Sequence, residues 1–157
     1  MTLCKIQLPL THLNLGEACY TDEPALVVTS LRSSVAVMMY NRRVHFAGVC
    51  HVRPVICKDR GLCSGYCDRT STHVDCATKQ MLELFEFLGI DREEIAVKLF
   101  GSADAAGCPD INIFKTIIID KGLQVADADW GVTITGKILF STHTGEVLTK
   151  LTGKNYL

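Results

Sequence analysis

The chain has 157 residues, of which 48% are hydrophobic and 21% charged, and its formal net charge at pH 7 is −1. These values are typical of one globular domain with a single core. The basic residues are scattered, apart from Arg42 and Arg43 and the pair Lys58 and Arg60, so we expect no nucleic-acid partner. No apolar run is long enough to span a membrane. Residues 1–7 show no sustained apolar region, so we expect a cytoplasmic protein without membrane insertion.

Apolar runs bounded by turn residues predict eight β-strands. The strands are expected near residues 10–16, 25–31, 34–40, 44–52, 94–101, 123–128, 134–141 and 146–151. Gly145, which follows Thr144, predicts a hairpin turn between the last two strands.

Apolar residues at helical spacing predict a helix over about residues 72–88. We expect its apolar face to pack in the core through Val74, Ala77, Met81, Leu84, Phe85 and Leu88. A second helix is expected to begin near Asp110 and to end at Gly122. Strands and helices together predict an α+β fold, in which mixed sheets form a sandwich and the helices pack outside. A single domain is expected to span residues 1–157.

Two of the predicted strands form a β-hairpin, because the apolar runs 35–40 and 44–50 are joined by a short polar segment. If the loop is Arg42-Arg43, the numbers of paired residues sum to 85 and Ser34 faces His51. Directly opposed residues share one face of a sheet, with Cβ atoms about 4.5–5.5 Å apart. A hydroxyl and an imidazole at that separation are typical of a nucleophile and its base.

Two alternatives stay open for this hairpin. A one-residue slip or a bulge would put the two side chains on opposite faces. Arg-Arg also lacks the Gly or Asn that type I′ turns prefer, so a longer loop is an alternative.

Eight cysteines are present, and four of them fall within twenty residues. These four are Cys57, Cys63, Cys67 and Cys76. Four thiolates are a ligand set for zinc or an iron–sulfur cluster, with His73 as an alternative to one cysteine. The spacing lacks the C-x₂-C pair of common zinc modules, and buried or unliganded thiols in a reducing compartment are the alternative. Cys50 is expected to face the core, on the side of its strand opposite to His51.

Several short segments occur in a recognisable order, namely Leu15-Gly16-Glu17, Pro24-Ala25-Leu26-Val27-Val28-Thr29, Ser33-Ser34-Val35-Ala36-Val37, Gly48-Val49-Cys50-His51, Val97-Lys98-Leu99-Phe100-Gly101-Ser102-Ala103, Asp129-Trp130-Gly131 and Thr144-Gly145-Glu146-Val147. Together they resemble the CheD family, whose members are chemoreceptor glutamine deamidases. The resemblance covers about residues 14–151 in the family's order. It implies a CheD-like domain. Residues 55–72 are expected to form a cysteine-rich loop inserted in that domain, a feature that the resemblance does not supply.

The resemblance also implies a site, and the sequence departs from the family pattern at the nucleophile of that site. The family motif Gly-Ser-Cys-Val-Ala-Val carries a nucleophilic cysteine, and Ser34 stands at that position here. His51 matches the family's catalytic histidine, and Thr29 matches the residue that orients it. A thiol with a pKa near 8.5 yields a thiolate near neutral pH, whereas a hydroxyl needs a base during attack and an oxyanion hole. Backbone amides near Ser33 and Ser34 are candidates for that hole.

Three functions follow as hypotheses. The first is a deamidase, in which Ser34 attacks a glutamine amide on the cytoplasmic helices of a chemoreceptor and no cofactor is required. The second is an inactive CheD-like module that binds a receptor or a CheC-like phosphatase. The third is a metal- or redox-responsive module that uses the four clustered cysteines.

Overall fold

The computed structural model describes residues 8–31, 34–53, 73–102, 111–132 and 136–151. The strands are β1 (Leu10–Leu13), β2 (Ala18–Thr21), β3 (Leu26–Leu31), β4 (Val35–Asn41), β5 (Phe46–Val52), β6 (Ala96–Ser102), β7 (Gln124–Val132), β8 (Gly136–Ser141) and β9 (Val147–Leu151). The helices are α1 (Val74–Phe87), α2 (Ile111–Asp120) and the 3₁₀ helix η1 (Arg92–Glu94). None of the described helices is long and apolar enough to cross a membrane.

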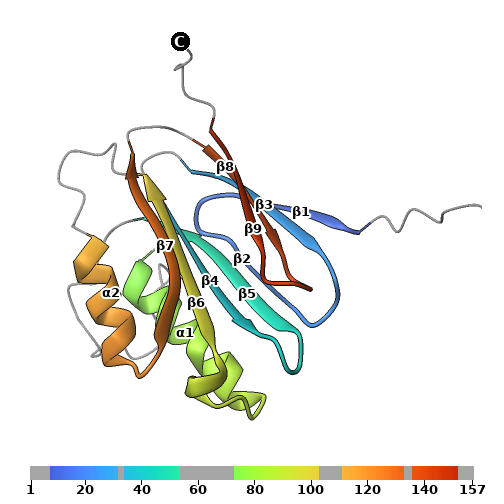
Figure 1. Ribbon diagram of the computed structural model, residues 1–157, viewed down its shortest axis with the longest axis vertical. Helices are drawn as coiled ribbons and strands as arrows, with labels where there is room; N and C mark the ends of the chain where they lie inside the picture. The colour runs from blue at the N-terminus through green and yellow to red at the C-terminus, as the bar shows by residue number, and fades with distance from the viewer. Residues whose placement is uncertain (1–7, 32–33, 54–72, 103–110, 133–135, 152–157) are drawn as a thin grey trace, which may run out of the picture.

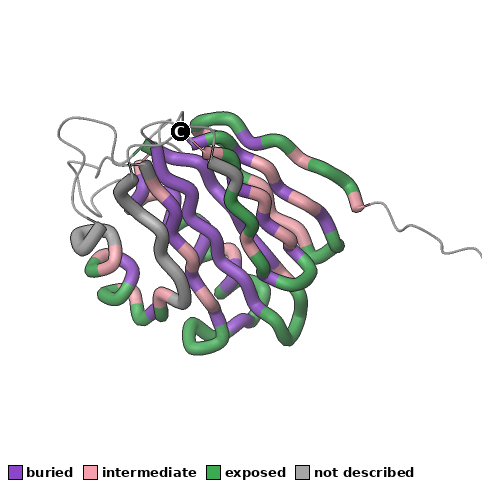
Figure 2. The backbone as a smooth tube through the Cα atoms, turned by 45° about the horizontal axis from the view of Figure 1, so that its top comes forward, coloured by how far each residue is buried: buried purple, intermediate pink, exposed green. Residues whose placement is uncertain are grey.

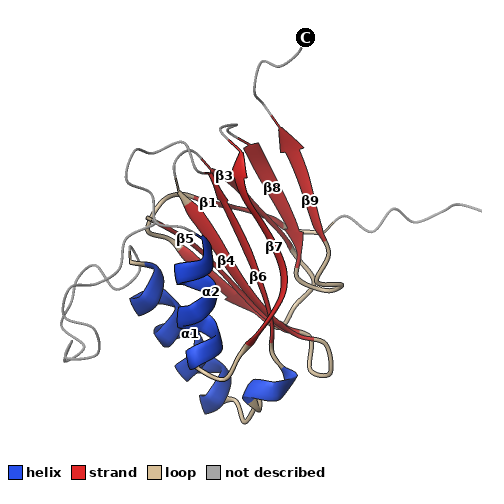
Figure 3. Ribbon diagram, turned by 60° about the vertical axis from the view of Figure 1, so that its left-hand side comes forward, coloured by secondary structure: helices blue, strands red, loops and turns tan. Residues whose placement is uncertain are grey.

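The strands form two mixed sheets (Figure 1). One sheet has the order β1-β3-β8-β9, and the other has the order β2-β5-β4-β6-β7. Both α-helices cover the face of the five-stranded sheet that points away from the four-stranded sheet (Figure 3). The fold is therefore α+β with mixed sheets and external helices, as the sequence predicts.

Strand β4 lies in the middle of this layered structure and is buried on both faces (Figure 2). Its odd-numbered side chains, such as Val35 and Val37, pack with those of the helices. Its even-numbered side chains, such as Ala36 and Met38, pack with residues of the other sheet. A strand between two apolar layers has no solvent-facing side, which explains why its sequence is a continuous apolar run.

The pairing within the β4–β5 hairpin differs from the expected one. Asn41 pairs with Phe46 and Ala36 pairs with His51, so paired numbers sum to 87 and the loop holds four residues. The Asn41 side chain accepts a hydrogen bond from the Val44 amide at 2.9 Å, and His45 closes the loop at φ +53. The longer loop arises because Arg-Arg does not favour the two positive φ values of a type I′ turn. The shift is two residues, so each side chain keeps its expected face.

Other boundaries also differ from expectation. The strand predicted over 10–16 is shorter, because Gly16 turns the chain at φ +87 into β2, which the sequence did not predict. Leu88 is exposed at the end of α1, and Leu82 takes a buried place on that helix. The hairpin turn at Gly145 is confirmed, with φ +75. A Cβ there would lie 2.8 Å from the Tyr40 ring, so both the backbone and the contact require glycine.

Candidate functional site

Three polar side chains meet at one end of the space between the two sheets. Thr29 comes from β3 of the four-stranded sheet, Ser34 directly precedes β4, and His51 lies on β5. Each of the three residues is at most 5% exposed. Buried polar groups persist in a core only when they are hydrogen-bonded, so their contacts define the site.

The hydrogen bonds order the three groups into a chain. The Ser34 Oγ lies 2.6 Å from the His51 Nε2, and the Thr29 Oγ1 lies 2.8 Å from the His51 Nδ1. The Thr29 hydroxyl also donates to the Leu13 carbonyl oxygen at 2.9 Å. Because a hydroxyl has one proton to give, Thr29 must accept from Nδ1–H. The neutral imidazole then has an unprotonated Nε2, which accepts a hydrogen bond from Ser34.

The expected proximity of Ser34 and His51 is present, although they are not directly opposed. Ala36 stands opposite His51, and Ser34 lies two residues before it on the same face. Diagonal neighbours on one face are within reach when one of them has a long side chain. The imidazole of His51 spans this diagonal.

The protonation of His51 is set mainly by its burial. Desolvation lowers the pKa of His51, while the Leu13 carbonyl and the Glu17 carboxylate act in the opposite direction. The net effect favours the neutral imidazole near pH 7. A neutral imidazole that is held by Thr29 and faces a hydroxyl is the arrangement of a base beside its nucleophile.

Cys50, next to His51, has the opposite environment. It is 1% exposed and packs in the cluster under the helices, on the face that the sequence predicts. Burial raises the pKa of Cys50 to about 12, so its sulfur stays protonated. A thiol on the far face of β5 cannot replace Ser34 beside His51.

The predicted metal ligands are mostly outside the described residues. Cys57, Cys63 and Cys67 lie there, as does the proposed insertion 55–72. Cys76 is partly buried on α1, and His73 precedes that helix. Among the described residues, no group of three or more His, Cys, Asp or Glu side chains is placed to hold a metal ion. The metal site stays a prediction, which elemental analysis of protein purified without added metal would test.

The segment that precedes β2 supplies site contacts that the sequence does not predict, although Leu15-Gly16-Glu17 is one of the segments that resemble CheD. Leu13 supplies the carbonyl that fixes the orientation of the Thr29 hydroxyl, and residues 14–17 bond to the backbone of His51. The polar turn around Asn14 and Gly16 was the available signal, because such residues mark a chain reversal. A backbone carbonyl, however, leaves no trace in sequence pattern.

Comparison with curated proteins gives consistent relatives. The chain is 35% identical to the probable chemoreceptor glutamine deamidase CheD 2 of Geobacter sulfurreducens, with 96% of this chain and 94% of that protein covered. The chain belongs to the CheD family. A probable chemoreceptor glutamine deamidase CheD of Oleidesulfovibrio alaskensis is 34% identical, with 92% and 73% covered. A CheD of Archaeoglobus fulgidus, with the same description, is 25% identical, with 88% and 90% covered.

Two other comparisons add little to the CheD assignment. No family model matches the chain. Among solved structures, a hypothetical protein YfiH of Bacillus licheniformis is 17% identical at a TM-score of 0.40. That match covers 68% of this chain and only 35% of the other, so the chain spans about a third of that protein's length.

Proposed function

We propose that this CheD-family chain hydrolyses the side-chain amide of glutamine residues on chemoreceptors, with Ser34 as nucleophile. The observation that carries the proposal is the 2.6 Å contact between the Ser34 Oγ and the unprotonated Nε2 of His51. The names of the CheD relatives support the substrate class. The catalytic residues are then Ser34 and His51, and Thr29 is a positioning residue.

The first half of the reaction forms an acyl-enzyme. The Ser34 Oγ attacks the amide carbon of glutamine, and its proton passes to the His51 Nε2. The imidazolium that results donates this proton to the amide nitrogen, which leaves as ammonia. The Nδ1–H stays bonded to Thr29, which keeps the ring aligned through both transfers.

The second half releases glutamate. Water attacks the ester carbonyl, and the neutral His51 takes one of its protons. The proton then returns to the Ser34 Oγ as the ester bond breaks. The sum is glutamine and water converted to glutamate and ammonia, and Ser34 and His51 end as they began.

A second candidate is a CheD module that binds receptor helices, or a CheC-like phosphatase, without turnover. The observation that favours it is the serine at position 34, where the family motif has cysteine. A hydroxyl depends fully on its base and on stabilisation of the oxyanion, whereas a thiolate forms near neutral pH. Ser33, one of the expected oxyanion residues, lies outside the described part of the chain.

One experiment separates the two candidates. The protein is incubated with cytoplasmic fragments of chemoreceptors from the same organism, and peptide mass spectrometry measures conversion of amide to acid. We expect conversion with the natural chain, and a loss of about 10³-fold or more with Ser34→Ala. The control is Ser30→Ala, an exposed serine on β3, which should leave the rate unchanged.

Two outcomes would contradict the proposal that Ser34 is the nucleophile of a deamidase. Fragments that bind the natural chain in a pull-down assay, yet keep all their amides, would overturn the deamidase proposal and support the binding module. Equal conversion by the natural chain and Ser34→Ala would show that another group is the nucleophile.

A further inference from the structure

A short turn connects the two sheets next to the candidate site. Strand β1 belongs to the four-stranded sheet and β2 to the five-stranded sheet, so residues 14–17 cross from one to the other. Thr29 and His51 come from the same two sheets. The contact between their side chains therefore depends on how the sheets are held together at this end.

The turn is bonded to both partners. At its start, the Leu13 carbonyl accepts the Thr29 hydroxyl at 2.9 Å. Further on, the Gly16 amide donates to the His51 carbonyl at 2.8 Å, and the His51 amide donates to the Glu17 carbonyl at 3.1 Å. Both backbone groups of His51 are thus held by this one segment.

Glu17 closes the turn on itself. Its carboxylate accepts the Asn14 backbone amide at 3.1 Å and the Asn14 side-chain amide at 3.3 Å. Its own amide donates to the Asn14 carbonyl at 3.0 Å. These reciprocal bonds resemble those of a helix capping box, in which a carboxylate satisfies amides of a chain reversal. The carboxylate is thereby fixed within the turn whose backbone bonds to His51.

We propose that Glu17 is a positioning residue for His51, which it holds through the turn of residues 14–17 and supports with its negative charge. The proposal rests on the function of His51 as a base. During attack by Ser34 the imidazole becomes an imidazolium, so a nearby carboxylate is worth more in the transition state than before it. Glu17 thus serves the reaction without touching the substrate.

The other titratable groups around His51 do not confound this effect. Strand β1 carries His12, β5 carries Cys50, and β2, which pairs with β5, carries Cys19 and Tyr20. Arg53 directly follows β5. Strand β3 carries no titratable side chain, and β4 carries only Tyr40, near its far end. All of these groups stay unchanged in a Glu17 variant, so the difference between the variant and the natural chain reports on Glu17. Because the Glu17 charge raises the pKa of His51 against the effect of burial, removal of that charge should lower the pKa of His51.

The test is a titration of the His51 ring by NMR in the natural chain and in Glu17→Gln, with the signal assigned from His51→Gln. We expect Glu17→Gln to lower the pKa of His51 by about 0.3–0.5, since the amide keeps the shape but loses the charge. Glu17→Asp should restore most of the natural value. In about 1 M salt the difference should shrink, because Glu17 is exposed and its field is screened.

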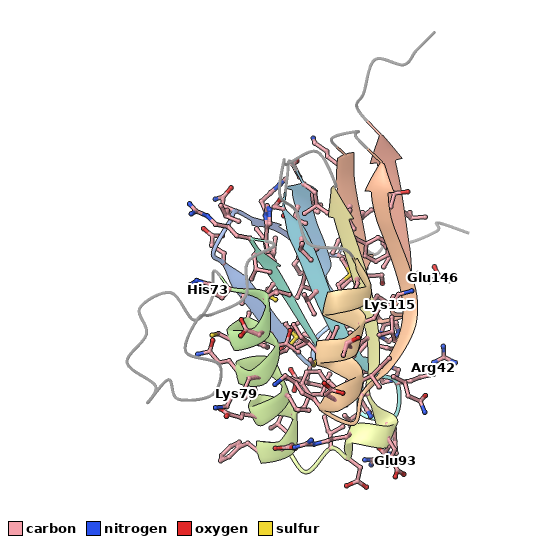
Figure 4. The ribbon with its side chains drawn as sticks, turned by 90° about the vertical axis from the view of Figure 1, so that its left-hand side faces the viewer. Arg42, His73, Lys79, Glu93, Lys115 and Glu146 are labelled. Carbon is pink, nitrogen blue, oxygen red and sulfur yellow. The ribbon has the colours of Figure 1, made fainter. Side chains whose placement is uncertain are left out.

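Glu146→Gln is the matched control. Glu146 is also an exposed glutamate at a chain reversal, but it lies away from His73 and the start of α1 (Figure 4). Gly145 contacts Tyr40, which is six residues along β4 from Ser34, or about 20 Å of strand. A pKa of His51 that is equal in Glu17→Gln, Glu146→Gln and the natural chain would overturn the proposal. So would a shift in Glu17→Gln that salt leaves unchanged, because a purely structural role predicts that result.

The kinetics of deamidation give a second test. If the chain deamidates receptor fragments, Glu17→Gln should reduce kcat about two- to threefold with KM unchanged, and should move the rise of rate with pH to lower pH. Glu146→Gln should change none of these values. The titration needs no turnover, so a shifted pKa in a chain without activity would refute the proposed function and leave the Glu17 inference standing.

Discussion

The two ends of the sandwich hold the same kind of contact with different consequences. At one end, the Thr29 hydroxyl donates to the Leu13 carbonyl and accepts from the Nδ1 of His51. At the other end, the Tyr40 hydroxyl donates to the His143 carbonyl at 2.6 Å and lies 3.3 Å from the Nδ1 of His45. In both places the Nδ1 of an imidazole lies beside a hydroxyl that donates to a carbonyl, and the His45 Nδ1 is also 3.3 Å from the His143 carbonyl oxygen.

The difference lies in burial and in the group that faces the second ring nitrogen. His51 is 5% exposed and its Nε2 faces the hydroxyl of Ser34. His45 is exposed on a loop, and its ring stacks on that of His143 with centroids 5.0 Å apart. Orientation of an imidazole by a hydroxyl therefore does not make a reactive site. In the proposed reaction the base also needs a nucleophile at Nε2, and at the first end the Ser34 hydroxyl lies there.

The largest effect should come from removing the imidazole of His51, and removal of the His45 imidazole is the comparison. His51→Gln should reduce deamidation of receptor fragments about 10³-fold or more, because the variant lacks the imidazole that takes the Ser34 proton in the proposed reaction. His45→Gln should change the rate less than about twofold. Initial rates of ammonia release measure both. Equal losses in the two variants would erase the distinction between the ends.

The hydroxyl that orients His51 comes next. Thr29→Val should reduce kcat about 10- to 100-fold, since the Nδ1–H loses its acceptor and the ring its alignment. The matched control is Thr142→Val. Thr142 is also a buried threonine, and it bonds the backbone of Ala25 at 2.8 Å. Both variants should lose about 1–3 kcal/mol of unfolding free energy in urea, but Thr142→Val should keep its kcat.

The third effect concerns the nucleophile. Ser34→Cys should raise the rate of deamidation at least about tenfold, because a thiol beside an imidazole ionises more readily than a hydroxyl. Rates are compared with the same receptor fragments and with Ser30→Cys, an exposed thiol on β3, as control. A folded Ser34→Cys variant that stays inert would mean that the pocket differs from a deamidase site in more than the nucleophile.

Much of the end that holds Ser34 and His51 was predictable, because the apolar periodicity of the strands indicates which side chains share a face. The parity of the β4–β5 hairpin follows from two apolar runs, so the shared face of Ser34 and His51 was predicted even though the register was two residues off. The register depends on the loop, where the Asn41 side chain and a positive φ at His45 outweigh the simplest two-residue turn. Such local choices are close in energy and are not visible in hydropathy.

The remaining parts depend on contacts between segments far apart in sequence. Thr29 meets His51 across 22 residues and from the other sheet, so periodicity alone gives no reason to pair them. The resemblance to CheD supplied that pairing. Strand β2 was missed because its four residues follow a tight turn and carry no strong alternation. The exposure of Leu88 reflects the end of α1, where the chain turns at Gly89 with φ +77.

A smaller effect should appear in the pH dependence of stability. The unfolded chain binds a proton at His51 near pH 6.5, whereas burial lowers the pKa of that group in the folded state. The unfolded state therefore holds more protons between the two values, and stability is lost as pH falls through that window. Urea midpoints between pH 7.5 and 5 should show this loss in the natural chain and in His45→Gln. The loss should be smaller in His51→Gln.

The smallest effect should come from the Tyr40 hydroxyl. Tyr40→Phe removes the bond to the His143 carbonyl but keeps the ring, which packs edge-on against Phe140 and close to Gly145. Because the carbonyl lies at a part-buried position that water can reach, we expect a loss of only about 1 kcal/mol in urea unfolding. The rate on receptor fragments should stay within about twofold, since the hydroxyl is at the opposite end of β4 from Ser34. A large loss of activity with unchanged stability would mean that the two ends are coupled through β4, and the contrast between a structural and a reactive imidazole would have to be given up.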